Sequence, residues 1–313
     1  MEKFPFVWKK GARPEDPLLQ KQREEKAEKQ LSWRRNREIS EWSHELPLTP
    51  ERKEMIEAAA LVFEKQFEVL GIPWKAEFSL RLFHFFDREG FDTQFPESVG
   101  NDGFHGKYDI TAVVEEKEKG KTLLTLFHEM AHVASAQKYM LTEEEEKLLL
   151  YRVGYAGVDV NSQNGGVDEK KTHFDAFNEG VVEMSALRMM IRYKETLAKQ
   201  LDIDEDLEEL ANKGHAYKNC VALVGIVIEK LAKLEGCEEL KVWKRIEKGQ
   251  YTGEMMWMRD IDTLFGRGSL RVLDAFVADP GKDAEVLARN VKIFRYFQTD
   301  DLAEREQLQT EIH

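Results

Sequence analysis

The stretch Thr125-Leu-Phe-His-Glu-Met-Ala-His-Val-Ala134 decides how this sequence is interpreted. Its two histidines, His128 and His132, are four positions apart. Around them, apolar residues repeat at helical spacing: Leu123, Leu124, Phe127, Met130, Ala131 and Ala134. Residues four apart on a helix share one face, separated by about 6 Å along the helix axis. We therefore expect both imidazoles to project from one face of a buried helix.

This histidine pair is suited to binding a single metal ion. Two imidazoles on one helical face can both reach a zinc ion at about 2.0–2.1 Å. Glu129 follows the first histidine, so its carboxylate can flank a metal-bound water and act as a general base. The alternative is a pair of core histidines with structural partners. The uncharged residues around the pair favour a helix through the centre of the protein over a surface helix.

A third zinc ligand is expected from a second helix. The segment Phe177-Asn-Glu-Gly-Val-Val-Glu-Met184 carries two acidic residues four apart in an otherwise apolar helical pattern. Glu179 lies 47 positions after His132 and is the expected ligand, and Glu183 is placed to bond the other ring nitrogen of a ligand histidine. Burying two carboxylates on an apolar face would be costly without a cation. A solvated acidic edge is the alternative.

Together, His128-Glu-Met-Ala-His132 and Asn178-Glu-Gly-Val-Val-Glu183 resemble the active-site helices of the gluzincin clan of zinc metallopeptidases. This clan includes thermolysin-like and aminopeptidase-N-like enzymes, and the resemblance covers about residues 105–225. It implies that His128, His132 and Glu179 bind one Zn²⁺ per chain and that Glu129 is the general base. It also implies that Glu183 and Asn178 support the ligands from behind, and that the substrate is a peptide or protein.

Other positions narrow the resemblance. The metzincin class would carry glycine and histidine where this chain has Ser135 and Lys138, so that class is excluded. Aminopeptidase-N-like enzymes carry a Gly-x-Met-Glu-Asn signature that nothing here matches, Val99-Gly-Asn-Asp-Gly103 included, so an aminopeptidase is not implied. The spacing between the two motifs is longer than in compact members, which predicts an insertion near the cleft.

Hydrolysis of an amide also needs a donor to the developing oxyanion. Tyr217, in Gly214-His-Ala-Tyr-Lys-Asn-Cys-Val-Ala-Leu-Val224, is the first candidate. The segment is similar to the Tyr-x-x-Gly helix start of aminopeptidase-N-like relatives, with Cys220 in place of the glycine. His215 is the second candidate, and Tyr193 and His173 are held in reserve. An amphipathic core tyrosine is an equally open interpretation of Tyr217.

We expect an α+β fold in which a small, mostly antiparallel sheet packs on the helix of the two histidines and a predominantly helical C-terminal lobe follows. The expected divisions are a charged N-terminal extension (1–45), a helix-plus-sheet subdomain (46–120), the catalytic helices (121–200) and the helical lobe (201–313).

Local patterns support these divisions. Thr49-Pro50 and Gly71 mark the two ends of a helix. The stretches 77–86 and 107–114 alternate in part or are β-branched, and Gly100-Asn-Asp-Gly103 supplies turn residues between them. A hairpin or loop is expected at 151–171, followed by a helix from about Asp175 to about Lys199. Substrate peptide is expected beside an edge strand near Tyr108–Val113.

Composition excludes several classes of protein. The 313 residues include 46 Lys and Arg against 59 Asp and Glu, a net charge of −13, which argues against binding nucleic acid or anionic membranes. Only two cysteines are present, so a disulfide framework or a thiolate zinc site is not expected. The longest apolar stretch, Cys220–Ile228, is well below the ~18 residues that span a bilayer. The charged N-terminus lacks a secretory pattern, so cytoplasm is the expected compartment.

Three functions remain open at this point. A zinc-dependent peptidase is the leading hypothesis. The alternative is a zinc-stabilised, non-proteolytic module on the same fold that binds a partner or regulates one. A zinc hydrolase of non-peptide substrates is a weaker third.

Overall fold

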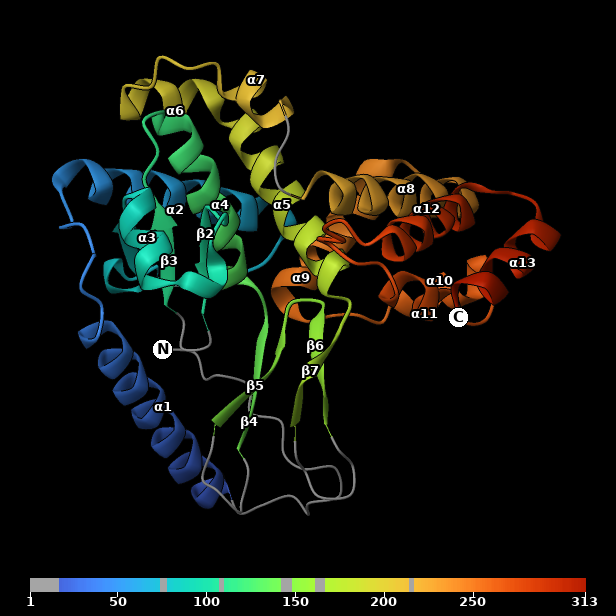
Figure 1. Ribbon diagram of the computed structural model, residues 1–313, viewed down its shortest axis with the longest axis horizontal. Helices are drawn as coiled ribbons and strands as arrows, with labels where there is room; N and C mark the ends of the chain where they lie inside the picture. Colours follow the sequence, from blue (N-terminus) through green and yellow to red (C-terminus); the bar gives the residue numbers. More distant parts are fainter. Residues whose placement is uncertain (1–16, 74–77, 107–109, 142–147, 161–166, 214–216) are drawn as a thin grey trace. The chain divides into compact units, whose positions relative to one another are not determined.

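The computed structural model of the chain shows an α+β protein, as predicted from the sequence (Figure 1). It describes residues 17–73, 78–106, 110–141, 148–160, 167–213 and 217–313. The chain divides into two compact units. The first comprises Met1–Tyr151, Ser162–Gly166 and Ala186–Gly214, and the second comprises Arg152–Asn161, Val167–Ser185 and His215–His313.

The first unit contains a three-stranded sheet with the order β1-β3-β2. The strands are β1 (Phe83–Phe86), β2 (Gly103–His105) and β3 (Thr111–Val114). β1 runs parallel to β3 and β2 runs antiparallel to it. Because β3 is the middle strand, the substrate edge expected near Tyr108–Val113 is wrong for Thr111–Val113, and Tyr108 lies outside the described residues. β2, which begins at a glycine expected to form a turn, is an edge strand instead.

Helices cover this sheet. The helices and 3-10 turns of the first unit are α1 (Pro17–Ser40), α2 (Pro50–Leu70), η1 (Leu80–Leu82), α3 (Arg88–Gln94), η2 (Pro96–Ser98), α4 (Lys119–Ala134), α6 (Lys194–Leu201) and α7 (Leu207–Asn212). α2 has the predicted ends: the Thr49 hydroxyl accepts from Arg52 N at 3.3 Å, and Gly71 closes the helix at φ 64°. α4 packs on β2 and β3, and α2 packs on α4 (Figure 1).

α4 is the central helix of the first unit. Its apolar residues Leu123, Leu126, Phe127, Met130 and Ala131 are fully buried. The ring of Phe127 stacks on Phe63 of α2, with centroids 5.9 Å apart. The prediction of a buried helix around the two histidines is therefore confirmed.

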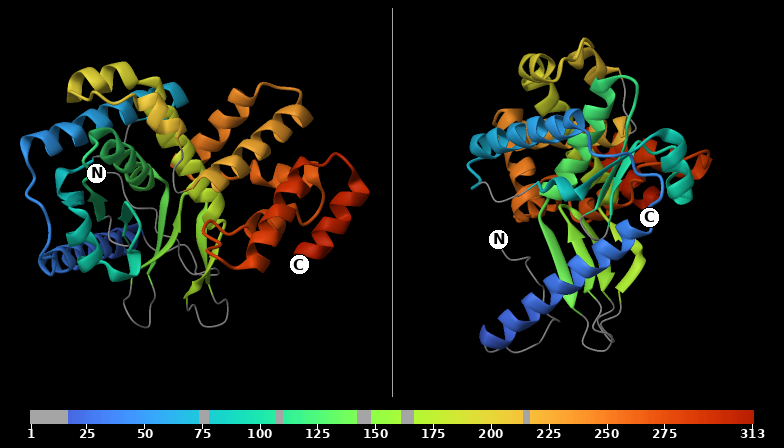
Figure 2. Two further views of the ribbon diagram at one scale, coloured as in Figure 1. Left: turned by 45° about the horizontal axis from the view of Figure 1, so that its top comes forward. Right: turned by 90° about the vertical axis from the view of Figure 1, so that its left-hand side faces the viewer.

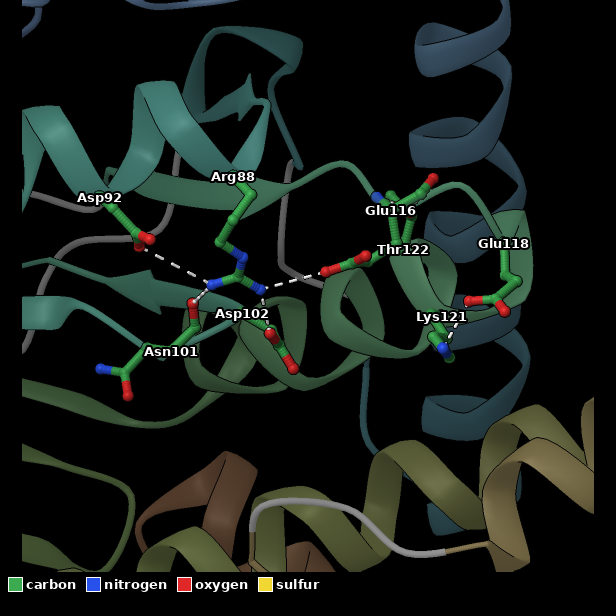
Figure 3. A network of polar contacts seen from close by, with 8 residues as sticks. All are labelled: Arg88, Asp92, Asn101, Asp102, Glu116, Glu118, Lys121 and Thr122. Carbon is green, nitrogen blue, oxygen red and sulfur yellow. Dashed lines mark hydrogen bonds and ion pairs between the residues drawn. The ribbon is translucent and has the colours of Figure 1, made fainter.

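Arg88 at the start of α3 ties together the segments that enter β2 and leave β3 (Figure 3). Its guanidinium donates to the Asn101 carbonyl oxygen at 2.5 Å, bonds the Asp102 carboxylate, and pairs with Glu116 at 3.1 Å. The amide of Glu116 in turn donates to the Thr122 hydroxyl of α4 at 2.9 Å. This network holds the backbone just before Gly103 and the beginning of α4 in fixed positions.

A second sheet has the strand order β4-β5-β6-β7. Its strands are β4 (Gln137–Leu141), β5 (Leu148–Val153), β6 (Ala156–Val160) and β7 (Val167–His173). β6 and β7 form an antiparallel hairpin with an irregularity between Val158 and Asp159. The hairpin expected at 151–171 is thus confirmed, although 161–166 lie outside the described residues.

After β7 the chain enters α5 (Asp175–Arg192). This helix is shorter than the predicted one, because the backbone at Tyr193 leaves the helical conformation (φ −110°, ψ 11°) and α6 begins afterwards. Nearly every apolar residue of α5 is buried, which agrees with its mostly apolar sequence.

The rest of the second unit is helical. Its helices are α8 (Lys218–Glu235), α9 (Glu239–Thr252), α10 (Met258–Phe265), α11 (Ser269–Asp274), α12 (Ala284–Gln298) and α13 (Leu302–Ile312). Residues of all these helices share one hydrophobic core. α12 and α13 pack against each other and lie side by side in the left view of Figure 2. Among the described residues, no helix combines the length and the apolar character needed to cross a membrane.

Candidate metal centre

His128 and His132 of α4 turn their rings toward one another. Their Nε2 atoms are 3.2 Å apart, and the rings meet edge to face with centroids 4.9 Å apart. His128 is buried and His132 is half-buried. Both imidazoles therefore present the same ring nitrogen to one point in space.

This spacing fits a zinc ion. In a tetrahedral site with Zn–N bonds of about 2.0–2.1 Å, two ligand nitrogens are about 3.3 Å apart. The observed separation of the two Nε2 atoms, 3.2 Å, is close to that value. The helical spacing of the two histidines thus produces the nitrogen geometry that a tetrahedral ion requires.

Glu179 of α5 completes a possible ligand set. One ligand atom from each of His128, His132 and Glu179 lies within 4.8 Å of the other two. Two imidazoles and one carboxylate are a donor set found in catalytic zinc sites, where the fourth position is left to water or substrate. The residues at this point are therefore of the right type to hold Zn²⁺.

Glu129, between the two histidines, is buried at 4% exposure. Its carboxylate Oε1 approaches the strand β2, where it lies next to Gly103. A buried carboxylate is costly unless a cation or hydrogen-bond donors compensate for it. A cation held by the neighbouring histidines would offset part of this cost.

His105 of β2 is a neighbour that the motifs did not indicate. Its ring lies parallel to that of His132, with centroids 6.4 Å apart. Its Nδ1 is 3.2 Å from the Thr111 hydroxyl, and its Nε2 is 3.2 Å from Nε2 of Gln137. Burial, together with electrostatic interactions with His132 and Arg35, lowers the pKa of His105 to about 3. His105 is therefore neutral, with both ring nitrogens occupied.

Asn178, which precedes Glu179, has a different set of contacts. Its side chain is buried, and Oδ1 accepts from the Tyr155 amide and from Gln250 Nε2, each at 3.0 Å. It therefore fixes the start of α5 against the turn between β5 and β6 and against α9. Glu183, one turn after Glu179, is also buried, with 4% exposure.

The junction between β7 and α5 is held by Asp274 of α11. One carboxylate oxygen is 2.7 Å from His173 Nδ1, and the other accepts from the Phe174 amide at 2.6 Å. Phe174 has φ 55°, a left-handed conformation that is rare for a bulky residue. Asp274 thus stabilises a strained turn that leads directly into the helix of Glu179.

The candidates for the oxyanion donor lie in different settings. Tyr217 stands at the start of α8, as the sequence indicated, and packs half-buried against the core of the second unit. His215 lies outside the described residues. Tyr193 is flanked by Lys65 and Arg192, whose cationic groups are each 5.7 Å from the ring centre.

Cys220 of α8 lies in an acidic setting. Burial, together with the nearby carboxylates of Glu179, Asp175 and Glu183, raises the pKa of its thiol to about 12. The thiol is fully buried. Cys220 therefore belongs to the packing around α5, and at neutral pH it is protonated.

Comparison with models of known protein families found no match for this chain, and neither the curated proteins nor the solved structures that were compared with it matched.

Proposed function

We propose that this protein is a zinc-dependent peptidase in which His128, His132 and Glu179 hold one Zn²⁺. The observation that carries this proposal is the 3.2 Å separation of the two histidine Nε2 atoms, which suits a tetrahedral ion. The carboxylate of Glu179, within 4.8 Å of the histidine ligand atoms, supplies the third donor. Glu183 and Asn178 support the helix that presents Glu179.

In this proposal zinc supplies, when bound, a positive charge that acidifies water toward a pKa of about 7 and polarises the substrate carbonyl. Glu129 accepts a proton at its carboxylate as water attacks the carbonyl, and then transfers that proton to the departing amide nitrogen. Its burial favours this role, because it shields the proton transfer from bulk water. Tyr217 donates a hydrogen bond from its hydroxyl to the oxyanion, with His215 as the second candidate donor.

The peptide substrate is proposed to pair with β2. The Val114 amide bonds the Asp102 carbonyl at 2.8 Å, and the Gly106 amide bonds the Ile110 carbonyl at 2.7 Å. Backbone groups alternate sides along a strand, so the amide and carbonyl of Gly103 point away from β3, toward the outer edge of the sheet. An extended peptide added there would lie beside Glu129.

The test uses the purified full chain, metal analysis and digestion of a peptide library. Wild-type protein should carry about one zinc per chain and cleave peptide bonds. Glu129→Gln should keep the zinc and lower the cleavage rate by about 10²–10⁴-fold, which is the usual contribution of a general base. Glu57→Gln, which changes an exposed carboxylate of α2, is the matched control and should behave as wild type.

Two results would contradict the peptidase. Cleavage by a metal-free protein would remove the role of zinc, and an unchanged rate in Glu129→Gln would remove the general base. Zinc bound at one per chain without cleavage of any peptide would favour the alternative, a zinc-stabilised module that binds or regulates a partner.

A further inference from the structure

Gly103 occupies a position where no side chain fits. A Cβ added there would lie 2.9 Å from the Ala112 carbonyl oxygen, 2.9 Å from Cγ2 of Thr125 and 3.1 Å from Oε1 of Glu129. The first two distances are shorter than the contacts that a Cβ atom makes with non-bonded heavy atoms in real structures. Gly103 is not among the glycines with positive φ, so its backbone conformation does not require glycine. Glycine is needed at position 103 because the neighbouring atoms leave no room for a Cβ.

Gly103 is the more crowded of the two glycines in this segment. Gly106 is three residues further along the same segment, and a Cβ there would meet nothing closer than 3.4 Å. A glycine in a strand that allows another group to approach the backbone closely is a recognised use of this residue. At Gly103 the groups that approach are Thr125 and Glu129, which are four apart and therefore on one face of α4.

Neither side of this contact can move away easily. Arg88 bonds Asn101 and Asp102 immediately before Gly103 (Figure 3), and Gly103 is in register with Val113 of β3. On the other side, α4 is fixed by its fully buried residues Leu126, Phe127 and Met130. An added methyl group would therefore act mainly on the most adaptable neighbour, the carboxylate end of the Glu129 side chain.

We propose that Gly103 is a positioning residue for Glu129. Because Gly103 has no side chain, the Glu129 carboxylate has room to lie against the edge strand, beside the peptide that pairs there. This inference rests on the proposed function. It adds that the residue at position 103 sets the distance between the base and the substrate backbone. Misplacement of a catalytic group by about 1 Å can cost about 10²-fold in rate.

The experiment compares Gly103→Ala with Gly106→Ala in the full chain loaded with zinc. Gly103→Ala should lower kcat by about 10–100-fold, with zinc content and KM close to wild type. Gly106→Ala should leave kcat unchanged, because its methyl group has room. If Gly103→Ala does not yield folded protein, the double variant with Thr125→Ser, which removes the methyl group 2.9 Å away, is measured in its place.

A double-mutant cycle separates positioning from a general loss of structure. Aspartate at position 129 withdraws the carboxylate by one methylene, so the methyl group at position 103 should no longer displace it. Gly103→Ala should therefore cost less than threefold in the Glu129→Asp background. An equal loss of kcat in both backgrounds would show a structural role and overturn the inference, as would a wild-type kcat in Gly103→Ala.

The two proposals fail in different ways. A wild-type protein that binds no zinc or cleaves no peptide overturns both. An active wild type whose activity depends on Glu129 but tolerates Gly103→Ala overturns only the role of Gly103.

Discussion

Gly180 of α5 lies directly against the backbone of Cys220 in α8: a Cβ on Gly180 would be 2.5 Å from the Cys220 carbonyl oxygen and 2.8 Å from a methyl group of Val224. The two helices therefore cross at backbone contact, at the residue that follows Glu179. Tyr217 is three residues before Cys220 and so lies on a neighbouring part of the same face of α8. The close crossing brings the helix of the proposed oxyanion donor against the helix of the proposed zinc ligand.

Replacing Gly180 by alanine should destabilise the protein. Alanine is a better helix former by about 0.8–1.0 kcal/mol, but overpacking of a tight contact costs about 1–3 kcal/mol. We expect a net loss of about 1–2 kcal/mol, seen as a lower Tm. Gly225→Ala in α8 is the matched control: its added Cβ meets nothing within 4 Å, so it should raise the Tm. A Tm for Gly180→Ala at or above that of Gly225→Ala would contradict the close crossing.

The two cysteines should differ sharply in reactivity. With its pKa raised to about 12, Cys220 has almost no thiolate at pH 8, whereas Cys237 is only half-buried. Native protein should be alkylated at Cys237 alone, and both sites should react in denaturant, as measured by mass spectrometry of peptides. Equal labelling of the two thiols in native protein would show that α8 does not shield Cys220.

The same pKa shift has a consequence at high pH. The unfolded chain releases the Cys220 proton near 9.0, and the folded protein keeps it to about 12. Between these values the unfolded state binds fewer protons, so stability falls as the pH rises. In Cys220→Ala this part of the decline should be absent when melting is followed from pH 8 to 11.

The sequence was sufficient to identify the two helices of the proposed site, because their patterns are local. His128, Glu129 and His132 repeat with the period of the helix that carries them, and the ends of α2 follow from Thr49, Pro50 and Gly71. The order of the three-stranded sheet could not be obtained this way. Whether β3 or β2 is the edge strand depends on pairing between segments far apart in the chain. The local pattern of apolar residues contains no information about that pairing.

The residues around the proposed site were also missed for physical reasons. The sequence predicts a turn at Gly100-Asn-Asp-Gly103, because glycine is typical both of turns and of strand positions that have no room for a side chain. Gln137 contacts His105, and Asp274 contacts Phe174. In each pair the two residues are far apart in the sequence, so no local pattern indicates the contact. The sequence carries one signal for the role of Gly103. A glycine close to a β-branched segment can indicate that another group approaches the strand backbone closely.

Asn178 should contribute to stability through two buried hydrogen bonds. Asn178→Ala removes the acceptor of the Tyr155 amide and of the Gln250 side chain, at about 1–3 kcal/mol for each group. Gln250→Ala removes only one of these bonds. The double variant should therefore be less destabilised than the sum of the single variants, by about 0.5–3 kcal/mol in a double-mutant cycle. Strict additivity would show that the two side chains do not act together.

Asp274 should control the beginning of α5. Removing its carboxylate in Asp274→Ala takes away the acceptor of the Phe174 amide and the partner of His173. Hydrogen exchange at the amide of Phe174 should then become faster. Asp279→Ala, which removes a similar bond to the Gly281 amide in an exposed turn, should leave the exchange of Phe174 unchanged. An unchanged rate in Asp274→Ala would mean that the strained turn is held by other contacts.

Zinc should stabilise the folded protein, and this stabilisation should depend on Glu179. A ligand that binds only the folded state adds about 4 kcal/mol when its free concentration is about 1,000 times its Kd. Removal of zinc by a chelator should therefore lower the Tm of the wild-type protein, and its return should restore it. Glu179→Ala leaves two imidazoles, so the Tm increase on adding zinc should fall to less than half. Glu229→Ala, which changes an exposed carboxylate of α8, should retain the full increase. If Glu179→Ala responded to zinc as strongly as the wild type does, the third ligand would have to be another residue, and the carboxylate of Glu179 would need a different explanation.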